Sequence, residues 1–332
     1  MSSYELVDPT LYQPLFVIPE AGESSPVPPR HESPTDEFMA ALYNPQYVGY
    51  GGISHAVYVF NEDRGVESTP PLVFVPPVDQ YNGAASRSGV QLLNGLATHL
   101  DRQIISIDLP ATGSSDRPKP SYYVQASLDA TAEMINYAVD SVGFKGENVD
   151  FMGICIGGAI AARAAVCRGG QTRSLLTFST PGFEADLHHR LSEQIRRNTP
   201  ESQADRRCDE LADSQAALYD NLGADYLDIR SLPSIDVHKI LRKFVHLKLG
   251  YELVGKHAAM LTLPEDLPPQ TQWHDFVGDK DILTSWQNHV RATGHRNPAT
   301  TRQTVLQEVG HDWPMIRAPY AARLAELALA GM

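Results

Sequence analysis

A cysteine occupies a turn whose residue types suit a reactive side chain. The run "GICIG", residues 153–157, follows a buried-strand pattern and opens an alanine-rich helical pattern, with Cys155 at its centre. The flanking glycines let the backbone turn sharply, so the sulfur would project from the end of a sheet. A helix N-terminus favours a nearby anion, here the reactive thiolate. Two interpretations remain open: a nucleophile, or a small buried cysteine in tight strand-helix packing.

Two acids and a histidine follow predicted strands later in the chain. Asp281 lies in the loop "FVGDKDILT", and Asp279 lies two residues earlier in the same loop. His311 comes just after the last predicted strand, in "VLQEVGHDWPM". A thiol, a carboxylate and an imidazole are the three groups that nucleophilic catalysis by cysteine uses.

The elements that must position these residues alternate in a βαβ rhythm. Short apolar runs separated by helical runs predict an α/β fold with a mostly parallel sheet and helices on both faces. We expect strands at residues 56–60, 72–75, 104–109, 149–155, 174–179, 273–278 and 304–310, and helices near 89–100, 121–142, 157–167, 285–293 and 319–330. The rhythm breaks in a polar, helix-favouring middle segment. The predicted units are therefore an arm (1–54), a first core part (55–180), an insertion (181–269) and a second core part (270–332).

The order of these residues along the elements resembles the α/β-hydrolase superfamily from about residue 55 to the C-terminus. In that family the nucleophile, the acid and the histidine follow one another at these strand ends, and "IDLPATGSSDRP" looks like the loop after its fourth strand. The resemblance implies a Cys155, Asp281, His311 triad, in which His311 handles the proton and Asp281 orients the imidazole. Asp279 is the other candidate acid. The family glycine three residues before the acid, here Gly278, favours Asp281. In having a cysteine at the centre of the run 153–157, the chain resembles dienelactone hydrolases and polyhydroxyalkanoate synthases.

The same resemblance implies an oxyanion hole made by two backbone N–H groups. One comes from the residue after the nucleophile, Ile156, and one from the loop after the third strand, "FVPPVDQYNG". Pro76 and Pro77 stand where the family often has His-Gly, and prolines have no N–H, so Val78 is the expected second donor. A purely structural Pro-Pro turn is the alternative.

A thiol suits activated acyl donors. When a thiolate attacks an oxygen ester, sulfur is the better leaving group of the intermediate and the reaction reverses, whereas with a thioester the leaving groups are comparable. The predicted function is therefore a thioesterase or acyltransferase that forms a thioester acyl-enzyme on Cys155. Two alternatives remain: a simple ester or lactone hydrolase, and a catalytically silent hydrolase-fold protein that binds a ligand or a partner.

The resemblance implies that the insertion is a helical lid that keeps water from the acyl-enzyme. Its apolar residues fit equally well a core of the lid's own. Its stretch "RLSEQIRRNTPESQADRR" fits either a contact with the phosphate of coenzyme A or of a carrier protein, or a solvated helix face, which the interleaved acids favour.

Composition restricts the partners. The chain has 332 residues, 42% of them hydrophobic, and a net charge of −13, which opposes binding to nucleic acid or an anionic membrane. We expect a small-molecule acyl substrate, free or bound to coenzyme A or a carrier protein, and no metal or cofactor.

The N-terminus lacks signal-peptide character and the three cysteines show no disulfide or zinc pattern, which favours a cytoplasmic protein. The proline-rich arm is either a partly disordered tail or a segment that lies against the body or a second subunit, as in a homodimer.

Overall fold

A computed structural model describes residues 33–64, 69–77, 83–85, 87–110, 112–116, 127–183, 263–279, 281, 284–294, 296–306, 309–311, 313–316 and 318–331. The strands are β1 (Gln46–Tyr50), β2 (Ile53–Phe60), β3 (Leu72–Val75), β4 (Ile104–Ile107), β5 (Val149–Ile154), β6 (Thr172–Phe178), β7 (Gln272–Gly278) and β8 (Thr301–Leu306). The α-helices are α1 (Asp36–Tyr43), α2 (Arg87–His99), α4 (Leu128–Val139), α5 (Ile156–Arg168), α9 (Leu263–Asp266), α10 (Trp286–Thr293), α11 (Trp313–Ile316) and α12 (Ala318–Ala330). Shorter helical turns span Gly83–Ala85, Asp140–Phe144 and Gly169–Gln171.

The strands form one eight-stranded sheet in the order β1-β2-β4-β3-β5-β6-β7-β8. Strand β2 pairs antiparallel with β1 and β4, and the remaining pairs are parallel. Continuous apolar runs form the central strands because both faces of those strands are covered: every residue of β3, β4 and β5 is buried. The predicted α/β fold with a mostly parallel sheet is confirmed.

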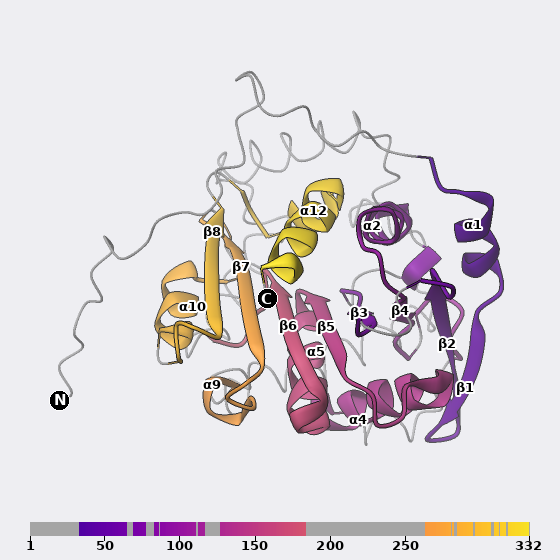
Figure 1. Ribbon diagram of the computed structural model, residues 1–332, viewed down its shortest axis with the longest axis horizontal. Coiled ribbons are helices and arrows are strands. Elements are labelled where there is room, and N and C mark those ends of the chain that lie inside the picture. Colours follow the sequence, from indigo (N-terminus) through magenta and orange to yellow (C-terminus); the bar gives the residue numbers. More distant parts are fainter. Residues whose placement is uncertain are drawn as a thin grey trace, which may run out of the picture.

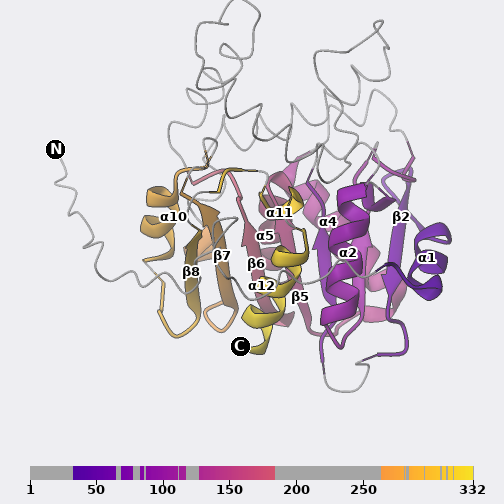
Figure 2. The ribbon, with the colours of Figure 1, turned by 90° about the horizontal axis from the view of Figure 1, so that it is seen from above.

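Helices cover both faces of the sheet (Figures 1 and 2). On one face α2 and α12 pack side by side, and their buried side chains join those of α1 and of Trp313 in α11 in one core. On the other face α4 and α5 pack together, and Ala292 of α10 belongs to the same core. Side chains alternate between the two cores along each strand, so a strand residue's number decides which helices it meets.

Part of the predicted arm forms regular structure. Of residues 1–54, the structure describes 33–54, which contain α1, β1 and the first two residues of β2. Thr35 caps α1, since its hydroxyl accepts a hydrogen bond from the Phe38 N–H at 3.1 Å. Strand β1 forms one edge of the sheet, where Tyr47 is 60% exposed. The boundaries of arm, insertion and core stay predictions.

A buried carboxylate joins the strands at the amino-terminal edge of the sheet. Asp150, at the start of β5, forms ion pairs with Arg102 and Arg173 and accepts a hydrogen bond from the Ser174 hydroxyl. A buried charge of this kind is tolerated only when it is fully paired. This cluster lies at the opposite end of β5 from Cys155, so it stabilises the sheet without reaching the carboxyl-terminal edge.

The carboxyl-terminal edge holds the residues singled out by the sequence. Cys155 follows β5, Asp279 and Asp281 follow β7, and His311 follows β8. The predicted lid falls mainly on residues 184–262, which lie outside the described residues. Among the helices that the structure describes, none has the length and apolar character needed to cross a membrane.

Candidate active site

Cys155 forms the turn between β5 and α5, as the sequence predicts. Its backbone has φ +54° and ψ −129°, a conformation that non-glycine residues seldom adopt and that stores strain. Two hydrogen bonds hold it: the Cys155 N–H donates to the carbonyl of Phe178, and the Gly158 N–H donates to the carbonyl of Cys155, both at 2.9 Å. The thiol is half-buried at the start of α5.

The glycines around Cys155 are required by close backbone contacts. A Cβ at Gly153 would overlap the Gly157 carbonyl, and a Cβ at Gly157 would overlap the carbonyls of Val75 and Pro76. The first turn of α5 therefore lies directly against the end of β3. This close approach requires glycines, and it places the turn at Cys155 beside the loop that follows β3.

His311 is held by Asp281. The Nδ1 atom of His311 lies 2.9 Å from Oδ2 and 3.1 Å from Oδ1 of Asp281. The Asp281 side chain is fully buried, and the backbone N–H of Thr284 donates to its Oδ1 at 2.9 Å. Because Nδ1 faces the carboxylate, Nε2 is the nitrogen left to exchange protons.

The electrostatics of the pair favour an ionised arrangement. Burial alone would raise the pKa of Asp281, but the charge of His311 and the hydrogen bonds from His311 and Thr284 outweigh it, so the pKa of Asp281 lies below its ordinary value. Burial alone would lower the pKa of His311, but the charges of Asp281 and Cys155 raise that pKa well above its ordinary value. At neutral pH the imidazole of His311 therefore carries a proton.

Cys155 acts on the His311 ring, which places the thiol next to the pair. Nε2 is buried and makes no hydrogen bond of ordinary geometry with any described residue. Catalytic hydrogen bonds are often long before substrate is bound and tighten in the reacting complex.

The structure pairs His311 with Asp281 and separates the two candidate acids. The backbone N–H of Asp279 donates to the carbonyl of Leu306 at 2.9 Å, which fixes Asp279 at the end of β7. Its Oδ1 is buried without a hydrogen-bond partner among the described residues, so its carboxylate makes no contact with His311 through that atom.

One of the two predicted oxyanion donors is described. Ile156 is the first residue of α5, where backbone N–H groups have no acceptor within the helix. Val78 lies outside the described residues. The contact between Pro76 and Gly157 shows that the loop after β3 starts next to Ile156.

Asp108, which the sequence analysis did not single out, connects two loops at the carboxyl-terminal edge of the sheet. It lies just after β4 and is fully buried, and burial raises its pKa. Its carboxylate accepts hydrogen bonds at 2.8 Å from the Tyr58 hydroxyl and from the backbone N–H groups of Ala84 and Ser114. It thereby joins the loops that follow β3 and β4. The sequence feature that could have indicated Asp108 is the pair Gly83 and Gly113, because a Cβ at either position would overlap the Asp108 carboxylate.

No group of three or more His, Cys, Asp or Glu side chains suited to a metal ion occurs within the described ranges. His188 and His189, the adjacent histidines of the insertion, fall outside those ranges.

Comparisons with known proteins agree with the observed fold. A family model described as the alpha/beta hydrolase family matches residues 72–326. A comparison with curated protein sequences found no match.

Solved structures with this fold come from several kinds of enzyme. A proline iminopeptidase from Mycobacterium smegmatis superposes with a TM-score of 0.58 at 15% identity, over 87% of this chain and 98% of the other. The thioesterase domain from the curacin biosynthetic pathway gives 0.54 at 15% identity, over 85% and 98%. An N-acyl homoserine lactone degrading enzyme gives 0.54 at 19% identity, over 84% and 98%. At these identities the likeness concerns the fold.

Proposed function

Because the chain belongs to the alpha/beta hydrolase family, a family of hydrolase-type enzymes, we propose that it is a cysteine-dependent acyl-transfer enzyme, a thioesterase or acyltransferase. The observation that carries the proposal is the contact of His311 with both Asp281 and Cys155, the latter held in a strained turn at the start of α5. A protein that only binds a ligand has no use for this trio.

In the first half-reaction the thiolate of Cys155 attacks the carbonyl carbon of an activated acyl donor. The sulfur-carbon bond forms, the carbonyl oxygen becomes an oxyanion, and the N–H of Ile156 is placed to stabilise it. The intermediate collapses when the bond from carbon to the donor's sulfur breaks. The departing thiolate takes a proton from Nε2 of His311, which leaves a neutral imidazole and a thioester acyl-enzyme.

In the second half-reaction neutral His311 takes a proton from water or another acceptor as that acceptor attacks the acyl carbon. The bond between the carbon and the Cys155 sulfur then breaks, and the thiolate-imidazolium pair is restored. Asp281 stabilises the imidazolium throughout by its contact with Nδ1. The donor is expected to be a thioester because sulfur is then both entering and leaving group. Turnover of the same acyl group presented on coenzyme A and on a carrier protein would show which of the two carries the donor.

The Cys155→Ser variant tests why the nucleophile is a thiol. The change keeps the geometry but replaces an easily ionised group with one that ionises poorly, so activity toward thioesters should fall by about a hundredfold or more. Remaining activity should shift from transfer toward hydrolysis, because an oxygen ester acyl-enzyme reacts less readily with amines or carbon nucleophiles.

One acyl thioester is incubated with the enzyme in water alone, which gives the rate of hydrolysis. It is then incubated with an added amine, and the ratio of acyl-amine product to hydrolysed product is measured. Cys167→Ser is the matched control, since Cys167 lies at the exposed end of α5. A serine variant with full rate and an equal ratio would instead support the simple ester or lactone hydrolase.

A further inference from the structure

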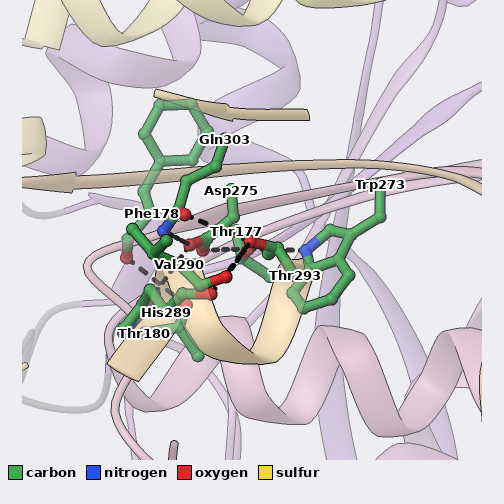
Figure 3. Close-up of polar contacts among 9 residues, drawn as sticks. All are labelled: Thr177, Phe178, Thr180, Trp273, Asp275, His289, Val290, Thr293 and Gln303. Atoms are coloured by element: carbon green, nitrogen blue, oxygen red, sulfur yellow. Dashed lines mark hydrogen bonds and ion pairs between the residues drawn. The ribbon is translucent and has the colours of Figure 1, made fainter. Parts of the chain in front are cut away.

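A second Asp–His pair lies inside the fold, away from the edge that holds Cys155 (Figure 3). Nδ1 of His289, on α10, is 2.7 Å from Oδ2 of Asp275, in the middle of β7, and both side chains are fully buried. The Thr177 hydroxyl of β6 donates to Oδ1 of Asp275 at 2.6 Å, and the Gln303 amide of β8 donates to Oδ2 at 3.0 Å. Three adjacent strands and one helix thus meet at a single carboxylate.

Further contacts fill the space around this pair. The Trp273 indole N–H donates to the Thr177 hydroxyl at 2.9 Å, and the Thr293 hydroxyl donates to the His289 carbonyl, also at 2.9 Å. The Phe183 ring lies 4.5 Å from the His289 ring and 5.9 Å from the Trp273 ring, measured between centroids. Phe183 is the third residue of the predicted insertion and the last one described before residue 263, so the start of the insertion packs on the same histidine.

A short path of hydrogen bonds leads from His289 to the candidate active site. The backbone N–H of His289 donates to the carbonyl of Ser285 at 3.1 Å, where α10 begins. The preceding residue, Thr284, donates its N–H to Oδ1 of Asp281 at 2.9 Å. Asp281 in turn holds His311. The position of α10 against β7 therefore sets where the Asp281 loop ends.

A buried carboxylate and imidazole are a costly way to attach a helix to a sheet, because well-packed apolar residues often stabilise a core as much or more. What a buried polar network adds is a single allowed arrangement, since a shift of α10 would break the contact of His289 with Asp275. We propose that Asp275 and His289 are positioning residues for Asp281: they fix the start of α10 and so keep the Asp281 carboxylate on Nδ1 of His311. This rests on the catalytic role of Asp281 in the proposed function.

A double-mutant cycle separates positioning from stability alone. Asp275→Asn, Asp281→Asn and the double variant are made in a chain whose other cysteines, Cys167 and Cys208, are serine. The rate of alkylation of Cys155 by iodoacetamide is followed by intact mass, because this rate reports the thiolate and needs no acyl donor. Turnover of an acyl thioester is measured alongside.

Asp275→Asn should slow both alkylation and turnover by about tenfold when Asp281 is present, because small displacements of catalytic groups are costly. It should have no further effect in the Asp281→Asn chain, since there is then no carboxylate to position. An equal loss in both chains, or no loss in either, would overturn the proposal. If Asp275→Asn slows alkylation only when Asp281 is present, and no thioester is turned over, the positioning role is supported and the proposed function is rejected.

Two further variants guard against loss of folding. Gln303→Met removes one donor to Asp275 from the half-buried edge of the network and should give the same pattern with a smaller loss. His274→Gln is the matched control. His274 is a buried histidine on the same strand, and its Nε2 lies 2.9 Å from the Thr304 hydroxyl. Its side chain faces away from α10. The substitution should lower stability and leave alkylation unchanged. If His274→Gln slowed alkylation as much as Asp275→Asn does, the slower rate would reflect a general loss of stability of the fold and not the position of Asp281.

Discussion

The two Asp–His pairs among the described residues differ in what surrounds the histidine. In both, an aspartate oxygen lies within hydrogen-bonding distance of Nδ1, at 2.9 Å for Asp281 and His311 and at 2.7 Å for Asp275 and His289. The His311 side chain is 11% exposed and a thiol acts on its ring, whereas His289 is fully buried against the Phe183 ring. The same two residue types thus occur at the edge of the sheet, where we propose a proton-transfer group, and within the sheet, where we propose that they hold α10 in place.

If the proposed roles hold, the neighbours of an Asp–His pair, more than the pair itself, decide what it does. An imidazole held by a carboxylate is oriented in either place. At the carboxyl-terminal edge the imidazole of His311 lies near Cys155, the proposed nucleophile, whose backbone is held in a strained turn.

The largest expected loss comes from removing the proton-transfer group. His311→Gln should lower turnover of an acyl thioester by about a thousandfold, because general acid-base catalysis contributes on this order. His289→Gln should cost far less turnover and more stability. Steady-state rates and thermal unfolding of both variants measure the contrast. Comparable losses of rate in the two variants would remove the distinction between the pairs.

The next largest effect concerns the acid. Asp281→Asn should lower the rate by about a hundredfold, since the acid orients and stabilises the imidazolium without transferring the proton itself. Asp279→Asn, two residues away and without the contact to Nδ1, is the control and should keep most of the rate. If Asp279→Asn were the more damaging change, the assignment of the acid would be wrong.

The smallest effect is the pH dependence of stability. The lowered pKa of Asp281 means that its contribution is present above about pH 4 and is lost as the pH falls through the folded-state pKa. The raised pKa of His311 means that its contribution is complete below about pH 6.5 and is lost as the pH rises through the folded-state pKa.

The difference in unfolding free energy between wild type and His311→Gln should therefore be largest between those two pH values and shrink on either side. Urea unfolding across the acidic, neutral and alkaline ranges measures it. A difference that stays constant with pH would contradict the pKa shifts of this pair.

Sequence patterns predicted the core of the fold because buried parallel strands leave continuous apolar runs. The positions of strands β2 to β8 along the chain and of helices α2, α4, α5, α10 and α12 could be read in this way, as could the turn at Cys155 from its glycines. The contact of Asp281 with His311 followed from a family resemblance, since nothing in spacing alone separates Asp281 from Asp279.

Other features depend on contacts between distant segments and left no such pattern. Proline content suggested an extended arm, yet residues 46–50 form an edge strand because they pair with β2. Asp275 and Asp108 are polar residues within or just after apolar strands, and their roles depend on donors from several other segments. Val78 and the predicted lid fall outside the described residues, so those predictions stand as made.

The most direct test of the account is covalent capture of the acyl group. Wild type and Cys155→Ala are each incubated briefly with a panel of acyl thioesters, quenched in acid and measured by intact mass, and the labelled peptide is then mapped. The account predicts a mass increase equal to one acyl group, located on the peptide with Cys155 and absent from the alanine variant, which remains folded. An adduct on another residue, or unchanged turnover in Cys155→Ala, would contradict the claim that Cys155 is the nucleophile.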